Sequence, residues 1–273
     1  MRHRIGFRYF NVKGLVKSVI TSRLKDWIKF FCDMRAYRKA NTIKDFKLNV
    51  KLMYPWLKDW RDFAGTSLNN LYLRQDLWAA KKIFHNHPEK HFDIGSRVDG
   101  FITHLLSFGV DVTLIDIRAL EGTIDDLSFL QADATNLSNI SDNSIASLSA
   151  LCSLEHFGLG RYGDPIDPAA CFKAFQSIQR VLAEDGDLYL SLPVGKDELA
   201  FNAHRIFNPE TVITAFDKLR LVEYSCVTKT HQHYQIPHVQ IDEVMNTLLR
   251  TSRNEDMFGL FHFKKPSLIG HTS

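Results

Sequence analysis

The chain has few cysteines and no pattern that would pair them. Its four cysteines, Cys32, Cys152, Cys171 and Cys226, are widely separated and show no C-x-x-C spacing. This distribution is typical of reduced thiols in a cytosolic-type compartment. It argues against a disulfide framework and against a zinc site built from cysteine.

Long apolar runs and a strong charge of one sign are also missing. No stretch approaches the roughly 18 apolar residues that a membrane span needs. Lysine and arginine interrupt every apolar segment near the N-terminus, so no signal peptide is predicted. The net charge of +3 gives no global reason to expect a nucleic-acid partner. We therefore expect a cytoplasmic globular protein whose 273 residues form one full core and an appended segment.

Two glycine motifs of nucleotide-binding proteins are absent or incomplete. No G-K-[ST] follows the glycine turn near residue 95, which excludes a phosphate loop. The G-x-G-x-x-G of nicotinamide and flavin sites is matched poorly, because Arg97 stands between Gly95 and Gly100. An oxidoreductase is therefore disfavoured.

A strand, a tight turn and a helix start are present at residues 91–100. The apolar pair Phe92 and Ile94 surrounds Asp93, Gly95 makes the turn, and a helical pattern begins near Phe101. Glycine is needed where the backbone bends sharply or approaches a ligand, and a helix start directs N–H groups toward whatever binds above it. Gly95 therefore marks a predicted ligand cradle, although an ordinary strand-to-helix turn would have the same pattern.

Strands and helices alternate after this turn. The pattern predicts strands at 110–115, 127–131, 144–151, 187–193, 219–227 and 257–263, and helices at 101–108, 167–182, 208–218 and 240–249. Such alternation specifies an α/β fold of the Rossmann-like type, with a doubly wound, mostly parallel sheet and helices on both faces. We assign residues 90–273 to this domain.

Residues 1–89 are predicted to form a basic, mainly helical N-terminal extension that packs on the core. Apolar residues recur at steps of three and four from about 11 to 40, and the first forty residues carry many more basic than acidic side chains. Packing on the core is the commoner fate of such a helix. The alternative is peripheral contact with an anionic membrane at its inner, cytoplasmic face. A second helix, over residues 75–84, leads into the first strand.

Three carboxylates each follow an apolar run, and their spacing is more informative than any one of them. Asp93, Asp116 and Asp133 stand at or just after the ends of the first three predicted strands. With Asp93-Ile94-Gly95-Ser96, they make the chain resemble the class I methyltransferases that use S-adenosylmethionine (SAM). The resemblance runs from about residue 90 to the end.

The resemblance implies specific roles for these residues. The turn at Asp93, Gly95 and Ser96 is similar to the family motif D-x-G-x-G-x-G, which cups the amino-acid part of SAM. By the same likeness, Asp116 would bind the ribose hydroxyls, and Asp133 with Ala134 would contact adenine. Arg97 departs from the motif, since it replaces a glycine where the family backbone comes closest to the ligand. It would either pair with the SAM carboxylate or fill the pocket.

A narrower resemblance rests on longer motifs. The runs 75–78, 91–101, 155–165 and 204–207 look together like an uncharacterised group, domain-of-unknown-function family 268. This family is treated as methyltransferase-like and commonly occurs near bacterial polysaccharide-building genes. The likeness spans roughly residues 70–220 and implies a fold and a genetic neighbourhood, but no substrate.

The loop after the fourth strand is the predicted site of chemistry. Loops on a rigid scaffold are the usual seat of function, and residues 155–165 combine several ionisable side chains with three glycines. We predict His156 or Glu155 as a general base for an acceptor hydroxyl, because histidine titrates near neutral pH. Substrate contacts are predicted for five further residues, namely Arg161, Tyr162, Asp164, His204 and Arg205. Each has a structural alternative, such as a histidine bonded to a backbone carbonyl or an Arg161–Asp164 pair that shapes the loop.

The His231-x-His233 pair with His238 suggests a metal site, but a solvated histidine-rich loop explains it better, and we predict no metal. The hypothesis is a SAM-dependent methyltransferase acting on oxygen or nitrogen of a small or glycan-related acceptor. The alternative is a non-catalytic Rossmann-like binding or scaffold protein of polysaccharide biosynthesis. A cavity left open beside Gly95 favours the enzyme, and an Arg97 guanidinium that plugs it favours the binder.

Overall fold

The computed structural model describes residues 12–49, 55, 57, 70–228, 233–235 and 257–267, and their side chains except at 12–23 and 233–235. The chain divides into two compact units, Met1–Ser67 and Leu68–Ser273, which are described separately.

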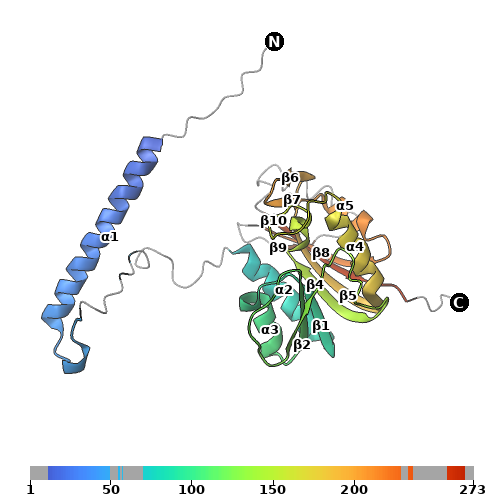
Figure 1. Cartoon of the computed structure of the whole chain (residues 1–273), viewed down its shortest axis with the longest axis horizontal. Coiled ribbons are helices and arrows are strands. Elements are labelled where there is room, and N and C mark those ends of the chain that lie inside the picture. Colours follow the sequence, from blue (N-terminus) through green and yellow to red (C-terminus); the bar gives the residue numbers. More distant parts are fainter. Residues whose placement is uncertain are drawn as a thin grey trace, which may run out of the picture. The chain divides into compact units, whose positions relative to one another are not determined.

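The first unit contains the predicted long helix, α1 (Val12–Ala40), and a short 3-10 turn at Lys44–Phe46 (Figure 1). In α1, four large apolar side chains at helical spacing are more than a third exposed, namely Leu24, Trp27, Ile28 and Phe31. The Trp27 and Phe31 rings stack with centroids 5.7 Å apart. Within the part of the chain that the structure describes, no helix has the length and apolar character needed to cross a bilayer. Packing of this unit on the core stays a prediction.

The second unit is built on an eight-stranded sheet in the order β3-β2-β1-β4-β5-β10-β8-β9. Strands β1 (Lys90–Ile94), β2 (Asp111–Asp116), β3 (Leu127–Gln131), β4 (Ile145–Leu151) and β5 (Leu182–Pro193) run parallel. Strand β10 (Met257–Lys264) pairs antiparallel with β5 and β8 (Arg220–Thr228), and β9 (His233–Gln235) pairs antiparallel with β8. The predicted mostly parallel sheet is confirmed.

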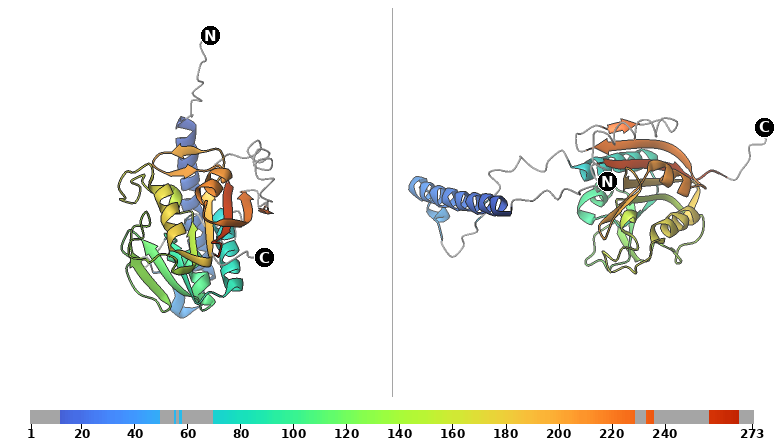
Figure 2. Two further views of the ribbon diagram at one scale, coloured as in Figure 1. Left: turned by 90° about the vertical axis from the view of Figure 1, so that its right-hand side faces the viewer. Right: turned by 90° about the horizontal axis from the view of Figure 1, so that it is seen from above.

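Helices cover both faces of this sheet (Figures 1 and 2). One face packs against α2 (Leu71–Asn86) and against α3 (Thr103–Ser107), which follows a π-helical turn at Val98–Ile102. The other face packs against α4 (Ala170–Val181) and α5 (Pro209–Ala215). Alternation along the strands separates the two cores, as in β10, where Leu260 faces the first layer and Phe261 the second. A small hairpin, β6 (Glu198–Ala200) with β7 (His204–Ile206), lies outside the main sheet.

The structure differs from the sequence-based expectations at the start of the second unit. The compact unit begins at Leu68 rather than residue 90, because α2 buries Trp78, Ala79, Ala80 and Ile83 in the core. The helix predicted at 240–249 lies outside the described residues, as do His231 and His238.

The parallel strands bring their carboxyl ends to one edge of the sheet, called the carboxyl edge below. Ile94 pairs in register with Ile115, and Asp116 with Gln131. Asp93, Asp116 and Asp133 therefore stand at the ends of three adjacent strands, as the sequence pattern predicts.

Candidate active site

The turn after β1 is closed by the Asp93 carboxylate. Asp93 is fully buried, and it accepts hydrogen bonds from the Ser96 amide and hydroxyl, both at 2.9 Å, and from the Ser149 hydroxyl. Burial raises the pKa of Asp93 to about 6, although these hydrogen bonds favour its charged form. Asp93 and Ser96 thus serve first to shape the turn.

Gly95 sits at the point of this turn with φ of +78°, a conformation that glycine adopts without strain. A Cβ atom at this position would lie 3.0 Å from Ser153 Cβ, just beyond the end of β4. The ends of β1 and β4 therefore approach each other closely, and only a residue without a side chain leaves the space between them open.

Two buried oxygens that follow β4 have no hydrogen-bond partner in the described structure. They are Ser153 Oγ and Glu155 Oε2. Buried polar atoms are almost always paired in folded proteins, because an unpaired one loses its bonds to water without replacement. Two such atoms, of which Ser153 Oγ lies beside the Gly95 turn, indicate a place where a ligand supplies the missing partners.

Glu155 is a carboxyl group that burial keeps protonated near neutral pH. Its side chain is 2% exposed, and burial raises its pKa to about 8, partly offset by a hydrogen bond from its own amide and by the Arg161 charge. Its second oxygen, Oε1, lies 3.5 Å from His156 Nε2. At pH 7 the Glu155 side chain is therefore mainly a hydrogen-bond donor.

His156 is tethered to the backbone, as its structural alternative anticipated. Its Nδ1 lies 2.6 Å from the Ala203 carbonyl oxygen, so Nδ1 carries the proton and Nε2 has the free electron pair. Burial lowers the pKa of His156 to about 4, so the ring is neutral at pH 7. Arg161 donates to the same carbonyl at 2.9 Å.

Two of the predicted substrate residues hold the backbone of the glycine loop. Asp164 accepts hydrogen bonds from the amides of Gly158, Gly160 and Tyr162 at 2.7–3.3 Å, and it does not pair with Arg161. Arg205 donates to the carbonyls of Glu155, Phe157 and Pro168 at 2.6–3.3 Å. Their polar atoms are thus engaged within the protein.

The other three predicted substrate residues lie together near His156. The rings of Tyr162 and His204 have centroids 5.5 Å and 6.4 Å from that of His156. The guanidinium groups of Arg161 and Arg118 both lie over the Tyr162 ring, at 5.2 Å and 4.6 Å from its centroid. Tyr162 thereby connects the loop after β4 with the end of β2.

The Asp116 carboxylate is occupied by Arg118. The guanidinium donates to both oxygens at 3.0 Å and 2.7 Å, and the Arg118 amide donates at 2.8 Å. The Arg118 side chain is 53% exposed, so the pair stands in partial contact with water. Any diol that binds Asp116 has to displace this guanidinium.

Asp133 and Ala134 lie just after the end of β3. Asp133 Oδ1 accepts from the Thr135 amide at 2.8 Å, and the buried Ala134 accepts at its carbonyl from Ser177. Arg97 points away from the turn, because its side chain is 86% exposed and pairs bidentately with Asp99. The guanidinium therefore does not plug the space beside Gly95.

Sequence reasoning gave no role to the α2 residues that reach this edge. Asp76 Oδ2 lies 3.2 Å from where a Gly100 Cβ would stand, and burial raises the pKa of Asp76 to about 6. Gln75 accepts from the Ser191 hydroxyl at 2.8 Å. Burial, with the charges of Cys152 and Glu155, raises the pKa of Tyr72 to about 12. The only sequence signal for these residues is that Gln75 and Asp76 belong to the 75–78 run, one of the four motifs that resemble the domain-of-unknown-function family.

Comparisons with known proteins agree with this architecture. The model of a family described as "Caenorhabditis protein of unknown function, DUF268" matches residues 122–247. The match includes the 155–165 and 204–207 runs, but not the runs at 75–78 and 91–101. A comparison with curated proteins found no match.

Several solved structures are similar to this chain. A "putative sarcosine dimethylglycine methyltransferase" from Galdieria sulphuraria has 14% identity and a TM-score of 0.50, over 71% of this chain and 86% of that one. The N-methyltransferase NodS from Bradyrhizobium japonicum WM9, in complex with S-adenosyl-L-homocysteine, has 16% identity and a TM-score of 0.48, over 78% and 92%. At these identities the likeness concerns the fold, which is the Rossmann-like fold of class I methyltransferases.

Proposed function

We propose that this chain is a SAM-dependent methyltransferase that acts on oxygen or nitrogen of a small or glycan-related acceptor. The observation that carries the proposal is the pair of buried, unpaired oxygens that follow β4, Ser153 Oγ beside the Gly95 turn and Glu155 Oε2 two residues further along the chain. They stand on the same carboxyl edge as Asp116 and Asp133. Ligands of open parallel α/β sheets bind at this edge.

The residues present fit the cofactor. The amino-acid part of SAM would lie against the backbone of the Gly95 turn, which Arg97 leaves clear because its side chain turns outward. Asp116 would accept hydrogen bonds from the ribose hydroxyls, and Asp133 with Ala134 would contact the adenine ring. When bound, SAM supplies an electrophilic methyl group, so much of the rate can come from holding the acceptor in line with it.

Glu155 is the residue that would accept the proton of an acceptor hydroxyl. In its ionised form, Oε2 takes this proton, while Oε1 faces His156 Nε2. His156 acts as a positioning residue, because its bond to Ala203 directs Nε2 toward Glu155. The neighbouring Arg161, Tyr162 and His204 would line the entrance for the acceptor, and Asp164 and Arg205 would hold the loop in place.

Calorimetric titration with S-adenosylhomocysteine tests the cofactor site. We expect binding by the wild type, and at least about tenfold weaker binding by Asp116→Ala, because each lost hydrogen bond to a charged group is worth about 1.5–3 kcal/mol. Asp111→Ala is the matched control, since it removes an exposed carboxylate at the other end of β2. No heat in the wild type, or equal losses in both variants, would overturn the proposal.

The Arg118–Asp116 pair supports a second candidate, a non-catalytic Rossmann-like binding or scaffold protein of polysaccharide biosynthesis. In such a non-catalytic protein, Arg118 would keep the Asp116 carboxylate from binding the ribose hydroxyls of a cofactor. Arg118→Met distinguishes the candidates. An enzyme binds S-adenosylhomocysteine as wild type and about fivefold more tightly in the variant, since releasing an exposed pair costs up to about 1 kcal/mol. A binder that has lost the cofactor shows heat only in the variant, or in neither protein.

We also propose that α1 contacts the cytoplasmic face of an anionic membrane. Its exposed stripe of Leu24, Trp27, Ile28 and Phe31 is accompanied by Lys25, Lys29, Arg35, Arg38 and Lys39. Apolar burial together with attraction to anionic lipids is how interfacial helices bind. The full chain is expected to float with anionic liposomes, and Trp27→Ser with Phe31→Ser to abolish flotation. The control, Phe46→Ser, also removes an exposed aromatic ring. Flotation that survives the double substitution contradicts this role.

A further inference from the structure

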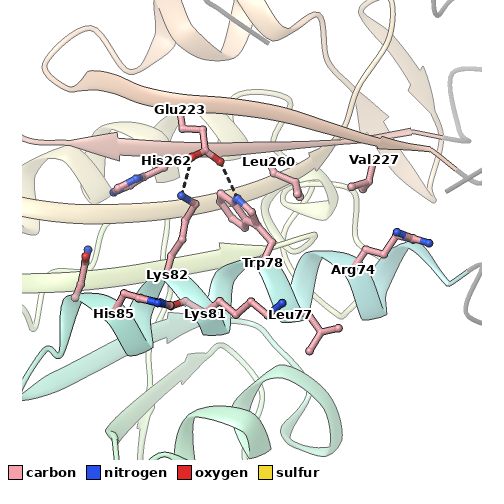
Figure 3. Close-up of a pocket in the computed structure, with 11 residues that line it drawn as sticks. Arg74, Leu77, Trp78, Lys81, Lys82, His85, Glu223, Val227, Leu260 and His262 are labelled. Atoms are coloured by element: carbon pink, nitrogen blue, oxygen red, sulfur yellow. Dashed lines mark hydrogen bonds and ion pairs between the residues drawn. The ribbon is translucent and has the colours of Figure 1, made fainter. Parts of the chain in front are cut away.

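A cavity, called the groove below, lies between one face of α2 and the strands β8 and β10 (Figure 3). Its volume is about 550 Å³, in the range of pockets that hold a small organic molecule. The helix contributes residues at positions 74, 77, 78, 81, 82 and 85, which share one face at helical spacing. None of the residues that line this groove belongs to the candidate active site.

The floor of the groove is apolar. Trp78, Val227 and Leu260 are all at least nine-tenths buried, and Leu77 is more exposed at the side. Such a surface favours the aliphatic or ring-shaped body of a ligand, because burying it removes apolar area from water.

One carboxylate in the groove already has its negative charge balanced by a neighbouring lysine. Glu223 accepts from Lys82 Nζ at 2.8 Å and from Trp78 Nε1 at 3.1 Å, and both side chains point toward it from α2 (Figure 3). Burial alone would raise the pKa of Glu223, but these hydrogen bonds hold it below its ordinary value. Glu223 therefore stays ionised, and its charge is balanced by Lys82.

Two cations remain unbalanced along the same helix face. Neither Arg74 nor Lys81 forms an ion pair with the described residues, and Arg74 Nε is buried without a hydrogen-bond partner there. A seven-residue separation places their backbones about 10 Å apart along the helix. With the Lys82–Glu223 pair balanced, the groove has an excess of positive charge and a buried donor that lacks an acceptor.

We infer that this groove binds a small organic anion. The ligand has an apolar or ring-shaped body that lies on Trp78, Val227 and Leu260. It carries a phosphate or carboxylate that accepts hydrogen bonds from Arg74 and Lys81. Both anions fit the guanidinium fork, and they supply the acceptor that Arg74 Nε lacks. This site is independent of SAM binding.

Isothermal titration of the full chain with hexyl phosphate tests the inference. Hexyl phosphate is expected to bind, whereas inorganic phosphate and hexanol, each of which carries only half of the recognised chemistry, bind at least about tenfold more weakly. Arg74→Gln and Lys81→Gln each lower the affinity for hexyl phosphate about tenfold. The control Lys196→Gln removes an exposed lysine outside the groove and leaves the affinity unchanged.

Other results would overturn the inference. Absence of heat with hexyl phosphate, or equal affinities in all three variants, removes the site. Equal binding of inorganic phosphate indicates an adventitious ion only, and equal binding of hexanol indicates an apolar pocket without anion recognition. Saturation with S-adenosylhomocysteine is expected to leave hexyl phosphate binding unchanged. If hexyl phosphate and S-adenosylhomocysteine displace each other, hexyl phosphate binds at the carboxyl edge and the inference about the groove is wrong. This outcome does not depend on whether the chain is a methyltransferase.

Discussion

Glu155 carries an ionisable carboxyl group into a place from which water is almost excluded. Its pKa is raised to about 8 by burial, and one of its oxygens has no partner in the described structure. A shift of this kind is common where a protein holds an acid or base for chemistry. Sequence position identified Glu155 as a candidate, but it did not indicate that the residue would be neutral at pH 7. The shift depends on burial by residues distant in sequence.

The raised pKa of Glu155 has a consequence for stability. Because the folded-state pKa lies above its ordinary value of 4.5, the unfolded state releases the proton first as the pH rises. The contribution of Glu155 to the free energy of unfolding is therefore fully present below pH 4.5. It falls as the pH rises through about 8, by up to about 5 kcal/mol in total. We expect Glu155→Gln to remove this loss, as measured by urea unfolding at pH 5 and pH 9.

The same substitution separates a catalytic role from a structural one. If Glu155 takes the proton from the hydroxyl of the methyl acceptor, the rate of methyl transfer by the wild type rises with pH, with an apparent pKa near 8. The rate of Glu155→Gln lacks this rise. The control Glu121→Gln changes an exposed side chain and is expected to keep both pH profiles. Unfolding curves of wild type and Glu155→Gln that stay parallel from pH 5 to pH 9 would contradict the buried, neutral carboxyl.

The glycine loop after β4 provides a test of packing at the scale of one element. Gly158 and Gly163 both have positive φ, +74° and +82°. A Cβ at Gly158 would lie 1.9 Å from the Asp167 carbonyl oxygen, whereas a Cβ at Gly163 meets nothing within 4 Å. A substitution by alanine therefore strains the backbone at both positions, but only at Gly158 does the added Cβ overlap with another atom.

Gly163→Ala is expected to cost only the strain, about 1–2 kcal/mol. Gly158→Ala is expected to cost about 3–5 kcal/mol, because overlap is added and the loop has to move. Chemical denaturation of the two variants measures the difference. Equal losses would show that the Asp167 carbonyl does not confine the loop.

Most elements of the second unit could be predicted from local patterns. Apolar runs ending in Asp93, Asp116 and Asp133 identified three strand ends, because strand periodicity and end position are local properties. The contacts of α2 could not be predicted in this way. Asp76 and Tyr72 reach the carboxyl edge only through the packing of α2 across the sheet, and Arg118 pairs with Asp116 through its side-chain rotamer.

At the scale of the whole molecule, the boundary between the two units moves from residue 90 to Leu68. The sequence pattern predicts that the domain starts at the first strand, but the preceding helix is part of its core. Trp78 also contacts Tyr189 edge to face, with ring centroids 6.2 Å apart. Burial of α2 is therefore a condition for folding of the sheet.

Two truncated chains test this boundary. Removal of residues 1–67 is expected to leave a folded unit with nearly the thermal midpoint of the full chain. Removal of residues 1–89 deletes the buried side chains of α2, and we expect a chain without cooperative thermal unfolding. A cooperative transition in the shorter chain would place α2 outside the core.

The central claim is that separate strand ends of one sheet together form a single adenosine site. Hydrogen exchange with mass spectrometry, with and without S-adenosylhomocysteine, tests it most directly. We expect the ligand to slow exchange simultaneously in segments 93–97, 116–118, 133–135 and 153–157, and to leave exchange in β8 and β10 unchanged. Protection confined to other segments, or no protection at saturating ligand, would contradict it.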